Sequence, residues 1–319
     1  MLFLLIFFFS FIVTFFGFPV IIPRMKKAGI TGKNMNNKKQ EIIPEMGGLV
    51  MVAGFSAGII MAIFIKIFFM LLTNVSLVAL LACLSTVLIV ALIGIFDDLI
   101  SVKQIIKAFM PIFAALPLMA IEIGDSSMMV PFLGRFDFGI IYPLFLVPLG
   151  VTGAANAFNM LAGFNGLEVG LGIICMVAVS IIAYITGSMT ALAISLSCLG
   201  VLIAALYYNW YPAKILIGDI GTLCIGTVLA ICVIVGDFET AGVILIIPFL
   251  IDFIIKAKYR FPYTFGVFKK GKLYCPEDGP KGLAHIFLKI FGGMQEKHLV
   301  MVLIGIESVF GMIAIFIYL

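Results

Sequence analysis

Ten runs of apolar residues, most of them close to the length of a membrane crossing, restrict the folds open to this chain. In hydrocarbon, every backbone N–H and C=O group must be hydrogen-bonded within the protein, so such runs fold as α-helices. Of the 319 residues, 63% are hydrophobic and 11% are charged, whereas soluble domains carry about 25% charged residues. The sequence therefore predicts an all-α integral membrane protein, with residues 1–319 as a single polytopic domain of about ten transmembrane helices. The expected spans are 2–22, 46–65, 76–96, 104–121, 139–157, 167–186, 189–208, 220–236, 240–256 and 299–318.

The basic residues predict how these spans are oriented. Lysine and arginine concentrate in the cytoplasmic connections of membrane proteins. If the segment 23–45 is cytoplasmic, ten alternating spans place every Lys and Arg except Lys66 and Arg135 on the cytoplasmic side. Both termini are then expected outside. This rule also accounts for the formal net charge of +4, so no nucleic-acid partner is needed to explain it.

The connection 257–297 is the longest polar element of the chain and is expected to be cytoplasmic. Residues 267–274, VFKKGKLY, have the pattern of a small hairpin. Five apolar residues then recur at helical spacing, with the polar residues Lys281, His285 and Lys289 between them, which predicts a helix just before the last span. That helix either lies in the membrane interface or packs within the loop. The apolar residues are Leu283, Ile286, Phe287, Ile290 and Phe291.

A polar stretch at the end of the fifth span, residues 154–168, is the strongest functional signal. It holds Asn156, Asn159, Asn165 and Glu168 in a chain that otherwise avoids polar groups. A buried amide costs several kcal/mol unless it is hydrogen-bonded. Four polar groups here therefore predict either a ligand-binding cavity, with Asn156 and Glu168 among its substrate-binding residues, or a seam of hydrogen bonds between helices.

Other polar groups fall at the same predicted boundary. Asp97 and Asp98 end the third span, Lys107 begins the fourth, and Asp219 opens the eighth. Acids and amides without an accompanying His or Cys favour a hard divalent cation, Mg²⁺ or Mn²⁺, over zinc. Adjacent basic residues favour a phosphorylated ligand, so the combination points to phosphoryl transfer at a lipid. Simpler interpretations stay open for single members: Asp219 could be a helix N-cap, and the Asp97–Asp98 pair could be solvated helix-end charges.

At these residues the chain resembles the polyprenyl-phosphate N-acetylhexosamine-1-phosphate transferases. Within that family it is most similar to the branch that transfers GlcNAc-1-phosphate from UDP-GlcNAc to dolichyl phosphate. The resemblance runs through nearly the whole chain. It is carried by residues 28–33 (AGITGK), 43–45 (IPE), 97–98 (DD) with Lys107, 156–166 (NAFNMLAGFNG), 218–219 (GD) and 288–293 (LKIFGG).

This resemblance implies roles at the phosphate end of a site. Asn159 and Asp219 would hold Mg²⁺ on the pyrophosphate of the donor. Asp97, Asp98 and Lys107 would be catalytic, contacting phosphate groups and activating the lipid phosphate. Which of the two aspartates acts as a base is left open.

The resemblance also implies which residues bind the rest of the donor. Gly163 and Asn165 would line the pocket for uracil, and Glu45 would lie beside the donor. Lys258 and Arg260 would contact the pyrophosphate and the sugar, although they could also be topology signals only.

The chain departs from the family pattern at three places. An aromatic residue that stacks on uracil in the relatives is Leu216 here, so nucleotide binding is expected to be organised differently. An Arg-His-Arg cluster of the relatives reads Lys258-Tyr259-Arg260. The loop 257–297 is shorter than in the eukaryotic enzymes, which favours a protein of the cell membrane of an archaeal-type cell over one of the endoplasmic reticulum.

These observations together predict transfer of GlcNAc-1-phosphate from UDP-GlcNAc to a polyprenyl phosphate of the dolichyl type, with release of UMP. The reaction would be the first step of lipid-linked oligosaccharide synthesis for protein glycosylation. The alternative is a secondary transporter of a small anionic or nucleotide-linked solute, because Glu307 lies in the middle of the last span and transporters place ionisable groups there. No oligomeric state follows from the sequence, and a homodimer stays open.

Overall fold

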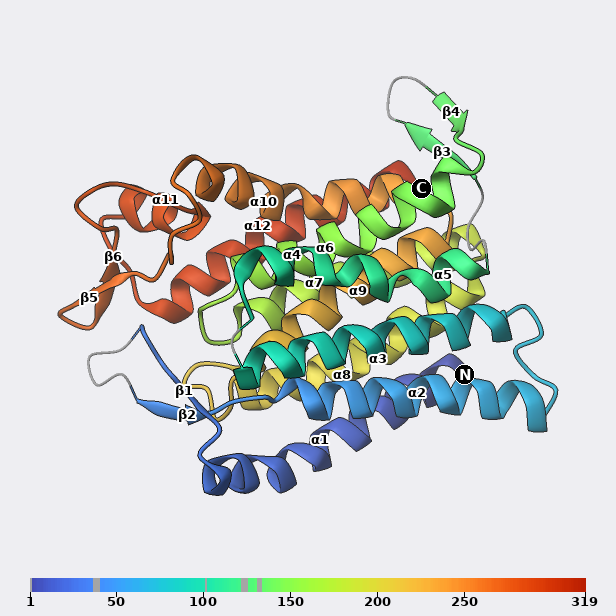
Figure 1. The fold of residues 1–319 in the computed structure, drawn as a ribbon, viewed down its shortest axis with the longest axis horizontal. Coiled ribbons are helices and arrows are strands. Elements are labelled where there is room, and N and C mark those ends of the chain that lie inside the picture. Colours follow the sequence, from blue (N-terminus) through green and yellow to red (C-terminus); the bar gives the residue numbers. More distant parts are fainter. Residues whose placement is uncertain (1, 37–40, 101, 122–125, 131–133) are drawn as a thin grey trace.

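A bundle of long, roughly parallel helices forms the body of the protein (Figure 1). The computed structural model describes residues 2–36, 41–100, 102–121, 126–130 and 134–319, so Lys38 and Lys39 of the basic segment lie outside the described residues. The helices are α1 (Leu2–Ala28), α2 (Gly48–Phe68), α3 (Leu77–Ile100), α4 (Gln104–Ala114), α5 (Leu116–Ala120), α6 (Val147–Leu161), α7 (Leu167–Thr186), α8 (Met189–Asn209), α9 (Gly218–Val235), α10 (Glu239–Lys258), α11 (Leu283–Ile290) and α12 (Glu296–Ile317), with a π-helical turn η1 (Tyr142–Leu146) leading into α6.

Among the described residues, nine helical segments are long and apolar enough to cross a membrane, which confirms an all-α membrane protein. The predicted fourth span, 104–121, differs from the others because it consists of the two short helices α4 and α5. Pro117 lies at the start of α5, where its missing N–H costs nothing. Both ends of the chain lie toward the same end of the bundle (Figure 1). Nine crossings would leave them at opposite ends, so α4 and α5 together make one further crossing of the bundle.

Helix α9 is the centre of the bundle, and glycines allow its neighbours to approach it closely. A Cβ on Gly226 would stand 2.1 Å from the carbonyl oxygen of Ala154 in α6. A Cβ on Gly94 in α3 would stand 2.5 Å from the Cα of Ile220. Small residues of this kind let helix backbones touch in membranes. They bring the ends of α3, α6 and α9 to one place.

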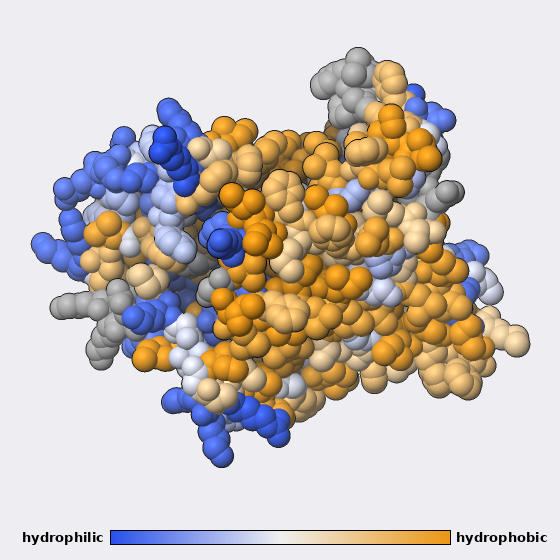
Figure 2. Space-filling view, in the orientation of Figure 1, coloured by the Kyte–Doolittle hydropathy of each residue, from blue (hydrophilic) through white to orange (hydrophobic). Residues whose placement is uncertain are grey.

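Short hairpins cover the two ends of the bundle. At one end lie β1 (Thr31–Lys33) with β2 (Ile42–Pro44), β5 (Val267–Lys269) with β6 (Lys272–Tyr274), and α11. At the other end β3 (Ser127–Val130) pairs with β4 (Gly134–Asp137). Hydrophilic residues gather over the first end, and an apolar belt covers the helices (Figure 2). The hairpin predicted at 267–274 is confirmed, with Phe268 opposite Leu273.

Helix α11 packs against the bundle through Leu283 and Leu288, which are both buried, while Ile290 and Phe291 are exposed. The sequence pattern grouped His285 with the polar residues of this helix. The structure corrects that grouping, because His285 is only 1% exposed. Its two ring nitrogens are used in the loop, as described below.

Candidate active site

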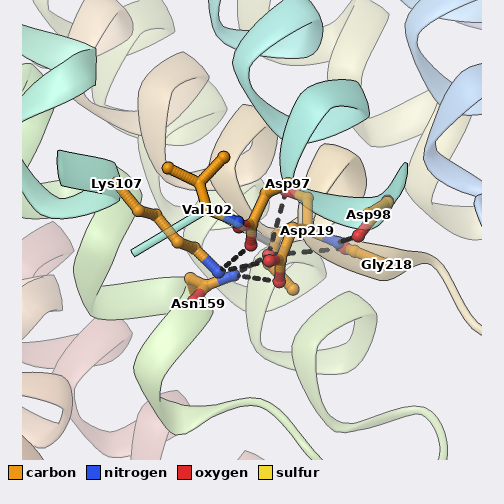
Figure 3. Close-up of polar contacts among 8 residues, drawn as sticks. Asp97, Asp98, Val102, Lys107, Asn159, Gly218 and Asp219 are labelled. Atoms are coloured by element: carbon orange, nitrogen blue, oxygen red, sulfur yellow. Dashed lines mark hydrogen bonds and ion pairs between the residues drawn. The ribbon is translucent and has the colours of Figure 1, made fainter. Parts of the chain in front are cut away.

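Two aspartates, a lysine and an asparagine meet where α3 and α6 end and where α4 and α9 begin (Figure 3). The Lys107 ammonium lies 2.6 Å from Oδ2 of Asp97 and also forms an ion pair with Asp219. Asn159 Nδ2 donates to Oδ1 of Asp219 at 2.5 Å and to Thr222 Oγ1 at 2.9 Å. Four residues that the sequence predicted from separate elements therefore touch one another.

Asp98 has a different position from its neighbour Asp97. Its Oδ1 accepts the backbone N–H of Asp219 at 2.9 Å, so it caps the start of α9. Gly218 makes this possible: its φ is +68°, and a Cβ there would stand 2.5 Å from Asp98 Oδ2. Asp98 thus holds the backbone of Asp219, while Asp97 faces Lys107.

A cavity of about 670 Å³ opens beside this cluster. Among its lining residues are ten that the sequence singled out: Glu45, Asp97, Asp98, Lys107, Asn159, Gly163, Asn165, Glu168, Leu216 and Asp219. Burial raises the pKa of the Glu45 carboxyl, and the nearby charge of Asp219 adds to this effect. Glu45 in the β2–α2 connection and Asp219 of α9 are therefore close enough for their charges to interact.

The side-chain oxygen atoms of this cluster meet some of the requirements of a hard cation, but not all of them. Among the described residues no group of three or more His, Cys, Asp or Glu side chains could hold a metal ion. Three convergent acids were expected, but Lys107 lies between Asp97 and Asp219, and Asp98 faces the helix backbone. The remaining oxygens suffice for Mg²⁺, which commonly takes only one or two carboxylates and completes its shell with water and substrate phosphates. Because amide N and O are assigned from hydrogen bonding, Asn159 can present either atom.

The loop 163–165, which also lines the cavity, is held by three side chains from three separate segments of the chain. Glu168 Oε1 accepts the Gly163 N–H at 2.6 Å, and Asn36 Nδ2 donates to the Gly163 carbonyl oxygen at 2.6 Å. Glu296 Oε1 accepts the Asn165 N–H at 2.8 Å. The sequence predicted Glu168 as a substrate-binding residue; in the structure Glu168 lines the cavity and its carboxylate accepts a hydrogen bond from the loop backbone. Asn36 and Glu296 were missed, because nothing in the sequence relates them to residues more than 100 positions away.

Lys256 is the basic residue of α10 that lines the cavity. Its ammonium lies 2.7 Å from Oδ2 of Asp252 and also donates to the Met160 carbonyl oxygen. Asp252 Oδ1 accepts the N–H of Leu283 at 2.7 Å, which ties α10 to α11. The sequence contains a signal for this pair that was not used: an acid and a lysine four residues apart inside an apolar span lie on one helix face.

Three of the predicted substrate-binding residues are not in the cavity lining. Lys258 and Arg260 are exposed, and Lys258 lies over the ring of Tyr259, 5.9 Å from its centroid. Lys258 is the last residue of α10, two positions after Lys256 and so on a different face of the helix, and Arg260 follows the end of the helix. Asn156 Nδ2 donates to the carbonyl oxygens of Ala108 and Thr152, both at 2.9 Å. The seam interpretation is therefore correct for Asn156.

Replacing Asn156 by alanine is accordingly expected to leave the KM for the nucleotide substrate unchanged. The stability of the purified protein should fall by roughly 0.6–2 kcal/mol, the range measured for hydrogen bonds between membrane helices. Thermal unfolding in detergent and steady-state kinetics measure the two quantities. A large rise in KM at unchanged stability would return Asn156 to the substrate site.

Membrane-length helices with an acid–lysine–amide cavity at one end of the bundle define a class: polytopic membrane proteins that handle an anionic ligand at the bilayer surface. Residues 80–237 match the model of glycosyl transferase family 4. A protein of Saccharolobus solfataricus is 39% identical over 96% of this chain and 94% of its own length, and its name assigns it provisionally as a UDP-N-acetylglucosamine–dolichyl-phosphate N-acetylglucosaminephosphotransferase. This chain belongs to glycosyl transferase family 4.

Two further relatives agree with this assignment. A protein of Sulfolobus acidocaldarius with the same provisional name is 37% identical over 96% of this chain and 93% of its own length. The UDP-N-acetylglucosamine–dolichyl-phosphate N-acetylglucosaminephosphotransferase of Dictyostelium discoideum is 25% identical over 92% of this chain and 83% of its own length. The predicted family is thereby confirmed.

Proposed function

We propose that this protein transfers GlcNAc-1-phosphate from UDP-GlcNAc to a dolichyl-type polyprenyl phosphate and releases UMP. The single observation that carries the proposal is the contact of Lys107 with both Asp97 and Asp219 in the wall of a cavity at one end of the bundle. The names of the family members with which the chain aligns over nearly its full length support the same reaction.

The reaction is a direct displacement at phosphorus. An oxygen of the lipid phosphate forms a bond to the β-phosphorus of UDP-GlcNAc. The bond from that phosphorus to the bridging oxygen breaks, and UMP leaves with the electron pair. The acceptor oxygen is already anionic, so no enzyme nucleophile is required, and the protein acts by positioning the groups and neutralising charge. Lys107 supplies positive charge to the phosphates, and Asp97 and Asp219 hold its ammonium in place.

The charge balance of the cluster favours a bound Mg²⁺ or Mn²⁺. When Asp97, Asp98 and Asp219 are ionised, three carboxylates accompany one ammonium, and a diphosphate would be repelled. Asp219 and Asn159 are the residues that would hold the cation, with Thr222 beside them. When bound, the cation supplies charge neutralisation on the diphosphate.

The protein is expected in the cell membrane of an archaeal-type cell, with the cavity on the cytoplasmic side and both termini outside. All described basic residues except Lys66 and Arg135 belong to the connections, or to the helix ends next to them, that the alternation of the spans puts on the cavity side, as the positive-inside rule requires for this orientation. The loop 257–297 would contribute to donor recognition, because residues 261–265 line the cavity.

A transporter is not supported. Ionisable groups near the bilayer midplane are typical of transporters, whereas here the acids and lysines of the cavity lie at helix ends. Glu307 is the exception in the last span. It is fully buried, and its Oε1 accepts a hydrogen bond from the Cys175 thiol at 3.2 Å, which joins α12 to α7.

Purified protein in lipid nanodiscs provides the test. We expect UMP release from UDP-GlcNAc only when both a polyprenyl phosphate and Mg²⁺ are present, and EDTA should abolish it. Mass spectrometry of the lipid should show a pyrophosphate-linked N-acetylhexosamine. UMP release without the lipid, or a phosphosugar bound covalently to the enzyme, would contradict direct displacement.

A further inference from the structure

One part of the cavity lining is chemically distinct from the acid cluster. Two aromatic rings, Tyr263 and Phe265, belong to this lining together with the loop 163–165. Their rings are parallel, with an interplanar angle of 9° and centroids 5.9 Å apart. Tyr263 is 81% exposed, so burial does not explain why its ring stands at this position.

Phe265 lies directly on the backbone of Gly163. A Cβ on that glycine would stand 3.1 Å from the ring edge of Phe265, and Gly163 has a φ of +130°. Any side chain at 163 would therefore push the ring away and strain the loop. An edge of the aromatic ring and the bare backbone of Gly163 therefore meet in the lining of the cavity.

The position of Phe265 is set from behind by His285 of α11. The Lys281 N–H donates to Nδ1 of His285 at 3.3 Å, so Nδ1 is an acceptor. The other nitrogen, Nε2, then carries the proton and donates to the Phe265 carbonyl oxygen at 3.0 Å. Burial lowers the pKa of His285, which favours this neutral form. Phe265 is thus held on a fixed support although it belongs to a loop.

An unused hydrogen-bond donor lies beside these rings. Asn165 lines the cavity and is 4% exposed. Its backbone N–H binds Glu296, but its side-chain Nδ2 is buried and has no partner among the described residues. A buried amide donor without a partner costs free energy, and a ligand carbonyl would satisfy it.

From this geometry we infer that Phe265 and Tyr263 form the surface on which the base of the nucleotide donor stacks, with Asn165 Nδ2 donating to a carbonyl on the edge of that base. A pyrimidine with two ring carbonyls offers both the flat face and the acceptor. Leu216, on the side of the cavity next to Gly32, has no π face to offer. This inference rests on the proposed function, because it places the uracil of UDP-GlcNAc at these rings and its diphosphate at the acid cluster.

The test is UMP binding to the purified protein in nanodiscs by isothermal titration calorimetry. Stacking of one base on an aromatic side chain corresponds to a factor of roughly 5 to 100 in affinity. Phe265→Leu should weaken UMP binding by that factor and raise the KM for UDP-GlcNAc, while kcat and the KM for the lipid phosphate stay near the wild-type values. Phe265→Tyr should bind UMP like the wild type. Phe291→Leu, which removes an exposed ring outside the cavity lining, is the matched control and should change nothing.

Inhibition by inorganic pyrophosphate separates stacking from a general disturbance of the site. Because pyrophosphate has no base, its inhibition constant should be the same for the wild type and Phe265→Leu. Equal UMP affinity of these two proteins, or a parallel loss of pyrophosphate inhibition, would overturn the inference while the wild-type transferase activity stands. A wild type that releases no UMP from UDP-GlcNAc would instead refute the proposed function.

Discussion

Asp219→Asn is expected to reduce UMP release by about 100- to 1000-fold, the usual cost of removing one electrostatic group from an active site. Asparagine keeps the shape of the side chain but loses the charge that pairs with Lys107. The substitution also replaces a carboxylate ligand of the proposed cation site by a neutral amide. Asn159, the other proposed ligand, contacts the same side chain. Steady-state kinetics with varied Mg²⁺ measures the effect, and we expect the loss in kcat to persist at saturating Mg²⁺.

Two controls make this result specific. Glu277→Gln removes a carboxylate whose side chain is 95% exposed on the loop, and activity should be unchanged. Asp98→Asn keeps an oxygen that can accept the Asp219 N–H, so its effect should be smaller than that of Asp219→Asn. Wild-type activity of Asp219→Asn, with the protein folded, would remove the catalytic role from this cluster.

Lys256→Met is expected to destabilise the protein by about 3–5 kcal/mol, because breaking a buried ion pair leaves one charge without compensation. The side chains of Lys256 and Asp252 are 6% and 2% exposed. Asp252 also binds the N–H of Leu283, so the loss should loosen α11 and the loop that it supports. Thermal unfolding in detergent measures the stability, and the KM for UDP-GlcNAc should rise with it.

A double variant tests whether the uncompensated charge causes this loss. Asp252→Asn retains an oxygen for the Leu283 N–H, so the combination of Lys256→Met and Asp252→Asn should recover most of the stability. The neighbouring Lys258→Met, which removes an exposed ammonium, should have little effect. A double variant as unstable as Lys256→Met alone would show that the ion pair is not the reason.

The end of the bundle at which each connection lies could be derived from the sequence, and this explains why several of the predicted residues come together. Asp97, Asn159 and Asp219 end or begin spans that alternate in direction, so they fall at the same boundary whatever the packing. Asn156 lies at that boundary too, only three residues from Asn159. It is in a seam because α4 packs on its face of α6, and the direction in which α4 packs is not encoded in the spacing.

The same distinction applies to the basic residues of α10. Lys256, Lys258 and Arg260 are equivalent as topology signals, and the resemblance favoured the last two. Only the rotation of α10 about its axis decides that Lys256 faces Met160 and Asp252. Glu296 and Asn36 illustrate a second limit, because their contacts with the loop 163–165 join segments that no local pattern relates.

By itself the sequence determined the number of apolar segments, their helical form and the end of the bundle at which the polar residues gather. These features follow from the requirement that backbone groups in hydrocarbon be hydrogen-bonded locally. The tertiary structure alone decided which side chains face the cavity, which support its walls and which ring lies on Gly163. Those features depend on the rotation of each helix, and that rotation is set by contacts such as Gly226 on Ala154 and Gly94 on Ile220.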